Sequence, residues 1–209
     1  MADALTLWLA AKAQANIPTA LIAGGPPTFT GVLGQQVFDT KYGITWWCDG
    51  TTWHANGPGL ISSIVYLAGN TGTVGAGSWT NISGYADLSD PLAMFTYANP
   101  GYFTLPLTGR YRATFFLQAG ATFPDGASFV GSIVVNAPTP PGAELCRINA
   151  PEGASVSYPA GTVTIDAYLA AGTKLYTAVV FGTASVVLGG TFASTTPPPT
   201  TFSLTFISS

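Results

Sequence analysis

The chain has 209 residues, of which only 7% are charged and 47% are apolar, and its formal net charge is −3. The apolar content excludes a disordered chain, and the acidic balance gives no footprint for nucleic acid. No run of about 18 apolar residues is present, so we expect no membrane insertion. With so few charges, we expect much apolar area to be buried between subunits.

The cysteines and the first residues indicate the compartment. Cys48 and Cys146 are too few for a disulfide framework, and we expect free, partly buried thiols, although their pairing stays open. Asp3 stands where a signal peptide needs positive charge, and Lys12 interrupts the apolar stretch. We therefore expect synthesis and folding in a cytoplasm.

Residues 3–17 are predicted to form a helix that Asp3 caps and that ends at Pro18. Its large apolar residues share one face at i, i+3, i+4 spacing: Leu5, Trp8 and Leu9. A helix of about four turns is marginal alone, so this stripe needs a partner. Two interpretations stay open: packing on its own domain, and attachment to a larger assembly or to symmetry copies.

Residues 18–30 contain Gly24-Gly25-Pro26-Pro27 and are predicted to be an extended arm or linker. Residues 1–33 together form the expected attachment segment.

Residues 34–57 contain three of the five tryptophans and the only histidine. Asp49-Gly50 suits a two-residue type I′ turn, because both central residues need positive φ. That turn predicts Trp46 opposite Trp53. A looser turn over residues 39–43 would then place four apolar side chains on one face: Phe38, Ile44, Trp46 and Trp53.

So small a module needs a partner surface. We expect a collar that packs on another part of the assembly or on its own copies. The alternative is an ordinary surface hairpin of a larger domain.

Residues 58–209 form the third expected part, an all-β domain of short strands separated by turn signals, as in a sandwich or barrel. The predicted strands cover residues 62–67, 78–88, 93–97, 101–104, 109–119, 128–136, 143–149, 154–158, 161–169, 174–181, 185–191 and 202–208.

One segment of this domain, residues 99–115, carries the pattern G-x-F-x-x-P-x-x-G-x-Y at Gly101, Phe103, Pro106, Gly109 and Tyr111. It resembles the signature of C1q/TNF-like jelly rolls, although Ala113 stands where that family has a larger apolar residue. Residues 166–179 and 201–207 resemble later strands of the same family, with Thr173 in place of its Asp.

The resemblance covers roughly residues 60–209. It implies an antiparallel jelly-roll sandwich and an intimate homotrimer. The resemblance also implies that seven aromatic side chains are divided between core and trimer contacts: Tyr102, Phe103, Tyr111, Phe115, Tyr176, Phe202 and Phe206.

The hairpin carries a second pattern between Phe38 and Trp53: aromatic-Asp-Thr, then Trp-Trp-x-Asp-Gly and a final Trp. This pattern is similar to a short module of bacteriophage fibre and appendage proteins. It implies a virion protein.

No motif of catalysis or cofactor binding is present, so we expect a non-enzymatic protein without a cofactor. His54 alone cannot form a triad. Two pairs of carboxylates could in principle serve as the acid and base of a glycosidase, but no motif in the sequence places either pair together: Asp39 with Asp49, and Glu144 with Glu152.

Asp87 and Asp90 are weak calcium candidates, since calcium needs six to eight oxygen ligands, and we expect them to be turn residues. Three arginines could contact an anionic glycan or a protein carboxylate, although solvated or paired arginines are the expectation: Arg110, Arg112 and Arg147.

These observations favour a structural protein of a tailed-phage virion, a trimeric fibre or tip on the virion surface that adheres to a host glycan or protein. Residues 1–33 would attach it to other virion proteins, and three loops could carry specificity: residues 121–127, 136–142 and 195–201. One alternative is a capsid decoration or head-fibre trimer docked on the shell. A distant alternative is a carbohydrate-active enzyme on a β scaffold.

Overall fold

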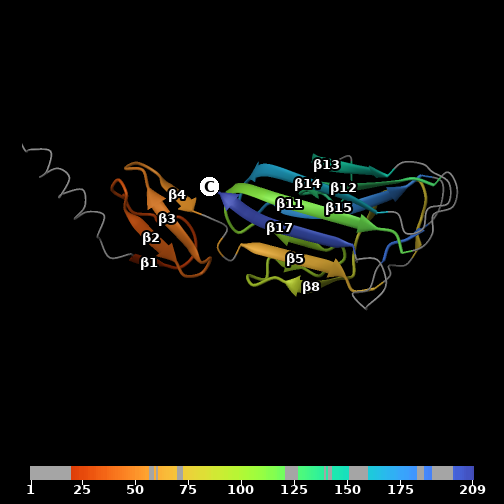
Figure 1. The fold of residues 1–209 in the computed structure, drawn as a ribbon, viewed down its shortest axis with the longest axis horizontal. Coiled ribbons are helices and arrows are strands. Elements are labelled where there is room, and N and C mark those ends of the chain that lie inside the picture. Colours follow the sequence, from red (N-terminus) through yellow and green to blue (C-terminus); the bar gives the residue numbers. More distant parts are fainter. Residues whose placement is uncertain are drawn as a thin grey trace, which may run out of the picture. The chain divides into compact units, whose positions relative to one another are not determined.

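The structure is a computed structural model that describes residues 20–56, 59, 61–69, 73–120, 127–138, 140, 143–150, 160–182, 186–189 and 200–209. The chain forms two compact units (Figure 1), residues 1–61 with 206–209 and residues 62–205. Every regular element of the described residues is a strand, so none of them is a helix that could cross a membrane. The predicted helix at 3–17 and the predicted strand at 154–158 lie outside the described residues.

The first unit is a small sheet of β1 (Ala20–Ile22), β2 (Gln36–Asp39), β3 (Ile44–Cys48) and β4 (Trp53–Asn56). β1 pairs with β2 in parallel, while β2, β3 and β4 form an antiparallel meander. Near the C-terminus, Ser208 pairs with Asn56. The segment predicted to be an extended arm or linker, residues 18–30, thus contains a strand of this sheet at Ala20–Ile22.

The hairpin between β3 and β4 has a different register from the predicted one. Cys48 lies opposite Trp53 and Trp46 lies opposite Ala55, so the connection is longer than two residues. The cause is the Asp49 side chain, whose Oδ1 accepts hydrogen bonds from the backbone N–H groups of Thr51 and Thr52 at 2.8 and 2.7 Å. This Asx-type turn competes with the type I′ turn and holds a wider loop.

The register also decides which side chains share a face of this sheet. Asp39, not Phe38, lies opposite Ile44, and Phe38 lies opposite Thr45. Ile44 and Trp46 are therefore buried, whereas Phe38 faces the other side and is 36% exposed. The prediction that Phe38 shares a face with Ile44, Trp46 and Trp53 is wrong, because successive residues of a strand point to opposite faces.

The second unit has two larger sheets and the antiparallel arrangement of a jelly-roll sandwich. The first of these sheets has the strand order β14 (Ala160–Leu169), β11 (Gly109–Gln118), β17 (Thr201–Ser208), β5 (Ser62–Leu67) and β8 (Tyr85–Ser89), with β17 paired to β5 through residues 201–205. The other sheet has the order β13 (Ala143–Ala150), β12 (Phe129–Val135), β15 (Lys174–Phe181), β10 (Tyr102–Thr104) and β9 (Phe95–Thr96), with β7 (Thr80–Asn81) also paired to β15. Two short strands, β6 (Thr73–Val74) and β16 (Val186–Val187), pair with each other.

Alternation of buried and exposed residues explains these strands. In the alternating part of β11, Tyr111, Ala113, Phe115 and Leu117 are buried, while Arg110 and Arg112 are exposed. The predicted strand at 78–88 is instead divided into β7 and β8. These two strands pair with different partners, and Gly84 between them has a positive φ of 83°.

Candidate interaction surfaces

Asp39 is a fully enclosed carboxylate of the first unit, with no exposed surface. Its carboxylate accepts four backbone hydrogen bonds of 2.8–3.2 Å, from Gly24, Gly25, Lys41 and Tyr42. Burial alone would raise the pKa of Asp39, but these four N–H groups outweigh it and hold the pKa below its ordinary value. Asp39 therefore clamps the segment after β1 to the turn after β2, and it presents no oxygen to a substrate.

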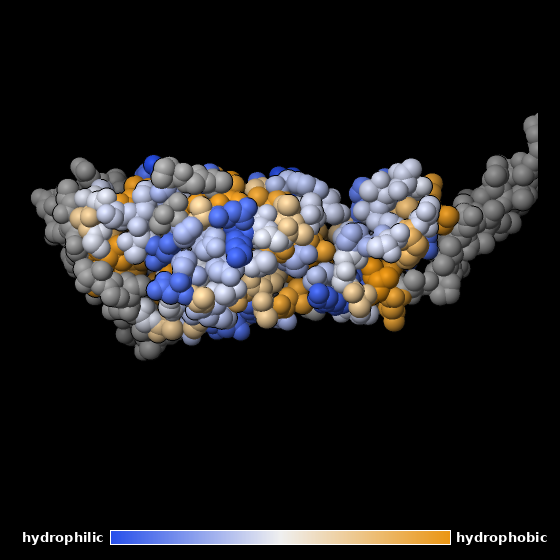
Figure 2. All heavy atoms as spheres, turned by 180° about the vertical axis from the view of Figure 1, so that it is seen from behind, coloured by the Kyte–Doolittle hydropathy of each residue, from blue (hydrophilic) through white to orange (hydrophobic). Residues whose placement is uncertain are grey.

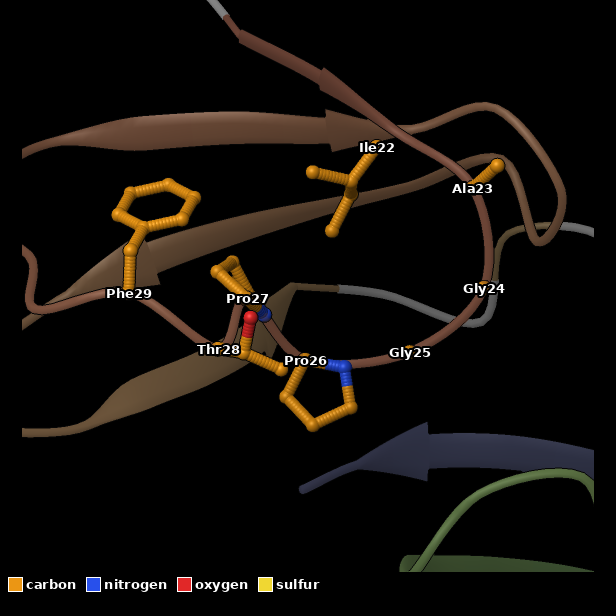
Figure 3. Close-up of a pocket in the computed structure, with 8 residues that line it drawn as sticks. All are labelled: Ile22, Ala23, Gly24, Gly25, Pro26, Pro27, Thr28 and Phe29. Carbon is orange, nitrogen blue, oxygen red and sulfur yellow. The ribbon is translucent and has the colours of Figure 1, made fainter.

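The clamped segment encloses a hollow of about 170 Å³ (Figure 3), lined by Ile22, Ala23, Gly24, Gly25, Pro26, Pro27, Thr28 and Phe29. Its side chains are mostly carbon, and none of the lining residues is ionisable. The hollow offers no ionisable side chain for acid–base catalysis, and none of the other lining residues could act as a base for its one hydroxyl group, that of Thr28.

His54 has its partners within the hairpin. Its Nε2 lies 3.0 Å from Oδ2 of Asp49, and its ring stacks on Trp47 with a centroid distance of 4.8 Å. The bond to His54 is the largest cause that holds the pKa of Asp49 well below its usual range. Asp49 and Asp39 thus serve separate local structures, and they do not form an acid pair.

The sheet of the first unit has one covered and one open face. Gly31 lies on the covered face, where an added Cβ would be 2.6 Å from Sγ of Cys48 and 2.6 Å from Trp53. Trp53 also donates its Nε1–H to the carbonyl of Phe29. On the open face, Phe38 lies between its register partners Leu21 and Thr45 on the two neighbouring strands. In the next row, Trp47 lies between Gln36 and His54.

Apolar residues are visible on the surface of both units (Figure 2), but most of the exposed large apolar side chains belong to the smaller unit. Among the described residues it holds six of the nine large apolar side chains that are exposed: Leu21, Phe29, Val32, Leu33, Phe38 and Trp47. Patches of this kind mark interaction sites.

The second unit presents a different surface on the outer side of β5, β17, β11 and β14. Hydroxyl groups face each other there, as in Thr114 with Thr164 at 3.0 Å and Ser62 with Thr205 at 3.2 Å. Among the described outward residues of these strands the charged ones are Arg110, Arg112 and Asp166. Arg112 binds Asp166 through two hydrogen bonds of 2.8 and 2.9 Å, and Arg110 lies 3.9 Å from the same carboxylate.

The seven aromatic residues expected in the core or the trimer contacts differ in burial. Six are buried within a single chain: Phe103, Tyr111, Phe115, Tyr176, Phe202 and Phe206. Phe103 contacts Phe202 at 4.8 Å between ring centroids, and the Tyr111 hydroxyl donates to the carbonyl of Leu107 at 2.7 Å. Tyr102 is half-buried beside Tyr176, with the Lys174 ammonium 4.6 Å from its ring centre.

The acidic calcium candidates have other roles or no ligand set. Both oxygens of Asp90 accept backbone N–H bonds, from Met94 at 2.9 Å and Phe95 at 2.8 Å. No group of three His, Cys, Asp or Glu side chains that could hold a metal occurs in the part of the chain that is described. Asp90 stands at the start of a turn, as expected, whereas Asp87 is an exposed residue of β8 and not a turn residue.

The remaining predicted residues fall in two groups. Glu144 pairs with Arg147 at 2.6 Å, and the Arg147 guanidinium lies 5.7 Å from the Trp79 ring centre. Outside the described residues lie Leu5, Trp8, Leu9, Glu152 and most of the three candidate loops.

Comparison with known proteins shows the fold of this chain. No family model and no curated protein matches it. Among solved structures, Eiger TNF from S. frugiperda aligns with a TM-score of 0.51 and 13% identity over 70% of this chain and 91% of that chain. Murine APRIL at pH 5.0 aligns with a TM-score of 0.47 and 13% identity over 70% of this chain and 99% of that chain. The globular domain of zebrafish complement 1qA aligns with a TM-score of 0.46 and 16% identity over 73% of this chain and 97% of that chain. The chain has the jelly-roll fold of C1q/TNF-type domains, as the sequence predicted.

Proposed function

We propose that this chain is a non-enzymatic structural protein of a tailed-phage virion, a homotrimeric surface appendage that recognises a host glycan or protein. The observation that carries the proposal is the outer face of β5, β17, β11 and β14. It belongs to a C1q/TNF-type jelly roll and combines hydroxyl rows with a single cluster of charge.

This outer face suits association between copies. Interface cores are depleted in charged residues and enriched in aromatic ones. Ile64, Tyr66 and Phe116 are partly exposed, and Tyr168 is 69% exposed, while the Arg112–Asp166 pair is satisfied within one chain. Three copies would each contribute a weak recognition site, and avidity would supply the strength of binding.

The virion location is supported by the aromatic pattern from Phe38 to Trp53, which resembles a module of phage appendages. The absence of catalysis is supported by the carboxylates. Five of the six in the described residues already accept hydrogen bonds from their own chain: Asp39, Asp49, Asp90, Glu144 and Asp166. Residues 1–19 would then attach the trimer to other virion proteins.

The proposal is tested by gold labelling of intact virions with an antibody against residues 62–205. We expect labels at fixed positions on the particle, and tail labels would mark a fibre or tip. Label confined to the capsid would favour the decoration protein. A protein that is abundant in the lysate but absent from purified particles would overturn the proposal.

A further inference from the structure

The open face of the first unit is an apolar surface bordered by neutral side chains and by the hydrogen-bonded pair of His54 and Asp49. Leu21 is 70% exposed, and Trp47 remains 39% exposed although His54 stacks on it. Leu21 and Phe38 are register partners, and Trp47 is a diagonal neighbour of Phe38 across the β2–β3 pair. Such diagonal positions are about 7–8 Å apart, within reach of aromatic side chains, so the three form one continuous patch.

The chemistry of this face limits its partner. Gln36 and Thr45 are neutral, and the ionisable His54 is bonded to Asp49 at 3.0 Å. A charged partner would lose hydration on this face without gaining an opposite charge, which is unfavourable. A partner with the same uncharged, apolar character meets no such penalty.

The size of the open face further limits the kind of partner that it can bind. Four strands about 4.8 Å apart, each contributing about four residues that rise 3.3 Å, cover on the order of 250 Å². A stable interface buries about 800 Å² on each partner, so this face cannot hold an independent partner firmly. It can hold one that is already tethered, because linkage gives an effective concentration in the millimolar range.

We propose that the open face of the first unit packs against the same face of the other copies of this chain. The inference rests on the trimer proposed above, since the second units would bring the copies together. Leu21, Phe38 and Trp47 then form a second, smaller contact that covers the exposed aromatic rings and joins the first units.

The test uses the full chain with a cysteine placed on the open face, Gln36→Cys, in a Cys146→Ser background; Cys48 is buried. Lys41→Cys is the matched control, because Lys41 is exposed on the turn between β2 and β3 and lies outside the open face. A short bismaleimide is added at micromolar protein. Tethering raises the effective concentration of both thiols alike, so contact between the open faces predicts that Gln36→Cys forms cross-linked dimers roughly 100-fold faster than Lys41→Cys.

Mass by light scattering is measured on the same samples to separate the two proposals. Trimers that cross-link only through Gln36→Cys support the contact. Trimers in which both variants cross-link equally slowly overturn this inference and leave the trimer standing. Monomers overturn both.

Trp47→Gln provides a second readout, because an exposed residue can be replaced without loss of the fold. We expect the urea concentration that separates the first units to fall, and the cross-linking rate of Gln36→Cys to drop about tenfold, since Trp is a frequent hot-spot residue. An unchanged rate would contradict the contact.

Discussion

The two units of this chain are stabilised in different ways. The second unit has a continuous aromatic core, in which Phe103, Phe115 and Phe202 are completely buried. The first unit has only a thin apolar layer around Trp46. It also depends on the buried carboxylate of Asp39 and on Gly31, whose missing side chain lets Cys48 and Trp53 pack close to the backbone. A small sheet has little apolar surface to bury, so single polar and steric details carry a larger share of its stability.

The outward surfaces differ in the same sense. The outer sheet face of the second unit satisfies its polar groups with hydroxyl pairs and the Arg112–Asp166 pair. The first unit leaves aromatic rings exposed. The comparison indicates that the large unit buries most of its large apolar side chains, whereas the small unit leaves several of them exposed.

The largest expected effect is in the core of the second unit. Phe202→Ala removes a fully buried ring that contacts Phe103 and Phe115, and it should lower the free energy of unfolding by about 3–5 kcal/mol. Urea unfolding followed by circular dichroism measures it. Leu88→Ala is the control, since that side chain in β8 is 50% exposed and should change little. Equal effects of the two changes would contradict the assigned core.

Asp39→Asn should destabilise the first unit by about 3 kcal/mol. The amide NH₂ that replaces one carboxylate oxygen cannot accept a hydrogen bond, so a backbone N–H that Asp39 now binds would lose its acceptor. The pKa of Asp39 is lowered in the folded state. Its contribution is therefore complete above the ordinary value of 3.8 and is lost as the pH falls below it.

Tryptophan fluorescence in urea at pH 7 and pH 3 checks this, since Trp46, Trp47 and Trp53 lie in this unit. Asp39→Asn should flatten the acid dependence, and Asp90→Asn, in the second unit, should leave it unchanged. If Asp39→Asn lost as much stability between pH 7 and pH 3 as the wild type does, the Asp39 clamp would not be the source of the acid dependence.

Gly31→Ala should cost about 2 kcal/mol in the first unit, because the new Cβ would overlap Cys48 and Trp53. Gly69→Ala is the matched control, since nothing lies within 4 Å of the position that its Cβ would take. The same fluorescence measurement applies. If Gly31→Ala left the stability of the first unit unchanged, the covered face would be more loosely packed than described.

The smallest effect is expected for Arg112→Gln on the outer face of the second unit. The Arg112–Asp166 pair is exposed, so solvent and salt weaken it. We expect a small decrease of the urea midpoint at low ionic strength and none in 1 M salt. A large decrease that persists in salt would mean that the pair lies in the buried centre of the contact between copies and not at its polar rim.

Much of the second unit could be predicted from the sequence, because alternation and turn residues are local signals. The strands at 62–67 and 174–181 have the predicted bounds. The region 78–88 was harder, since local propensity does not tell that β7 and β8 pair with different strands.

The first unit was predicted less well, because its register depends on side-chain hydrogen bonds. Asp49-Gly50 suggests a tight turn, but Asp49 captures two N–H groups and widens the loop. An Asp at the start of a turn, such as Asp39, is a signal that sequence reasoning can use. Its burial depends on donors 14 and 15 residues earlier, which local patterns do not reveal.

The mass of the full chain in solution, measured by light scattering at micromolar concentration, tests the central claim most directly. A single chain has a mass of 21.5 kDa. The account predicts a species of three chains that persists on dilution. A stable species of 21.5 kDa would contradict it.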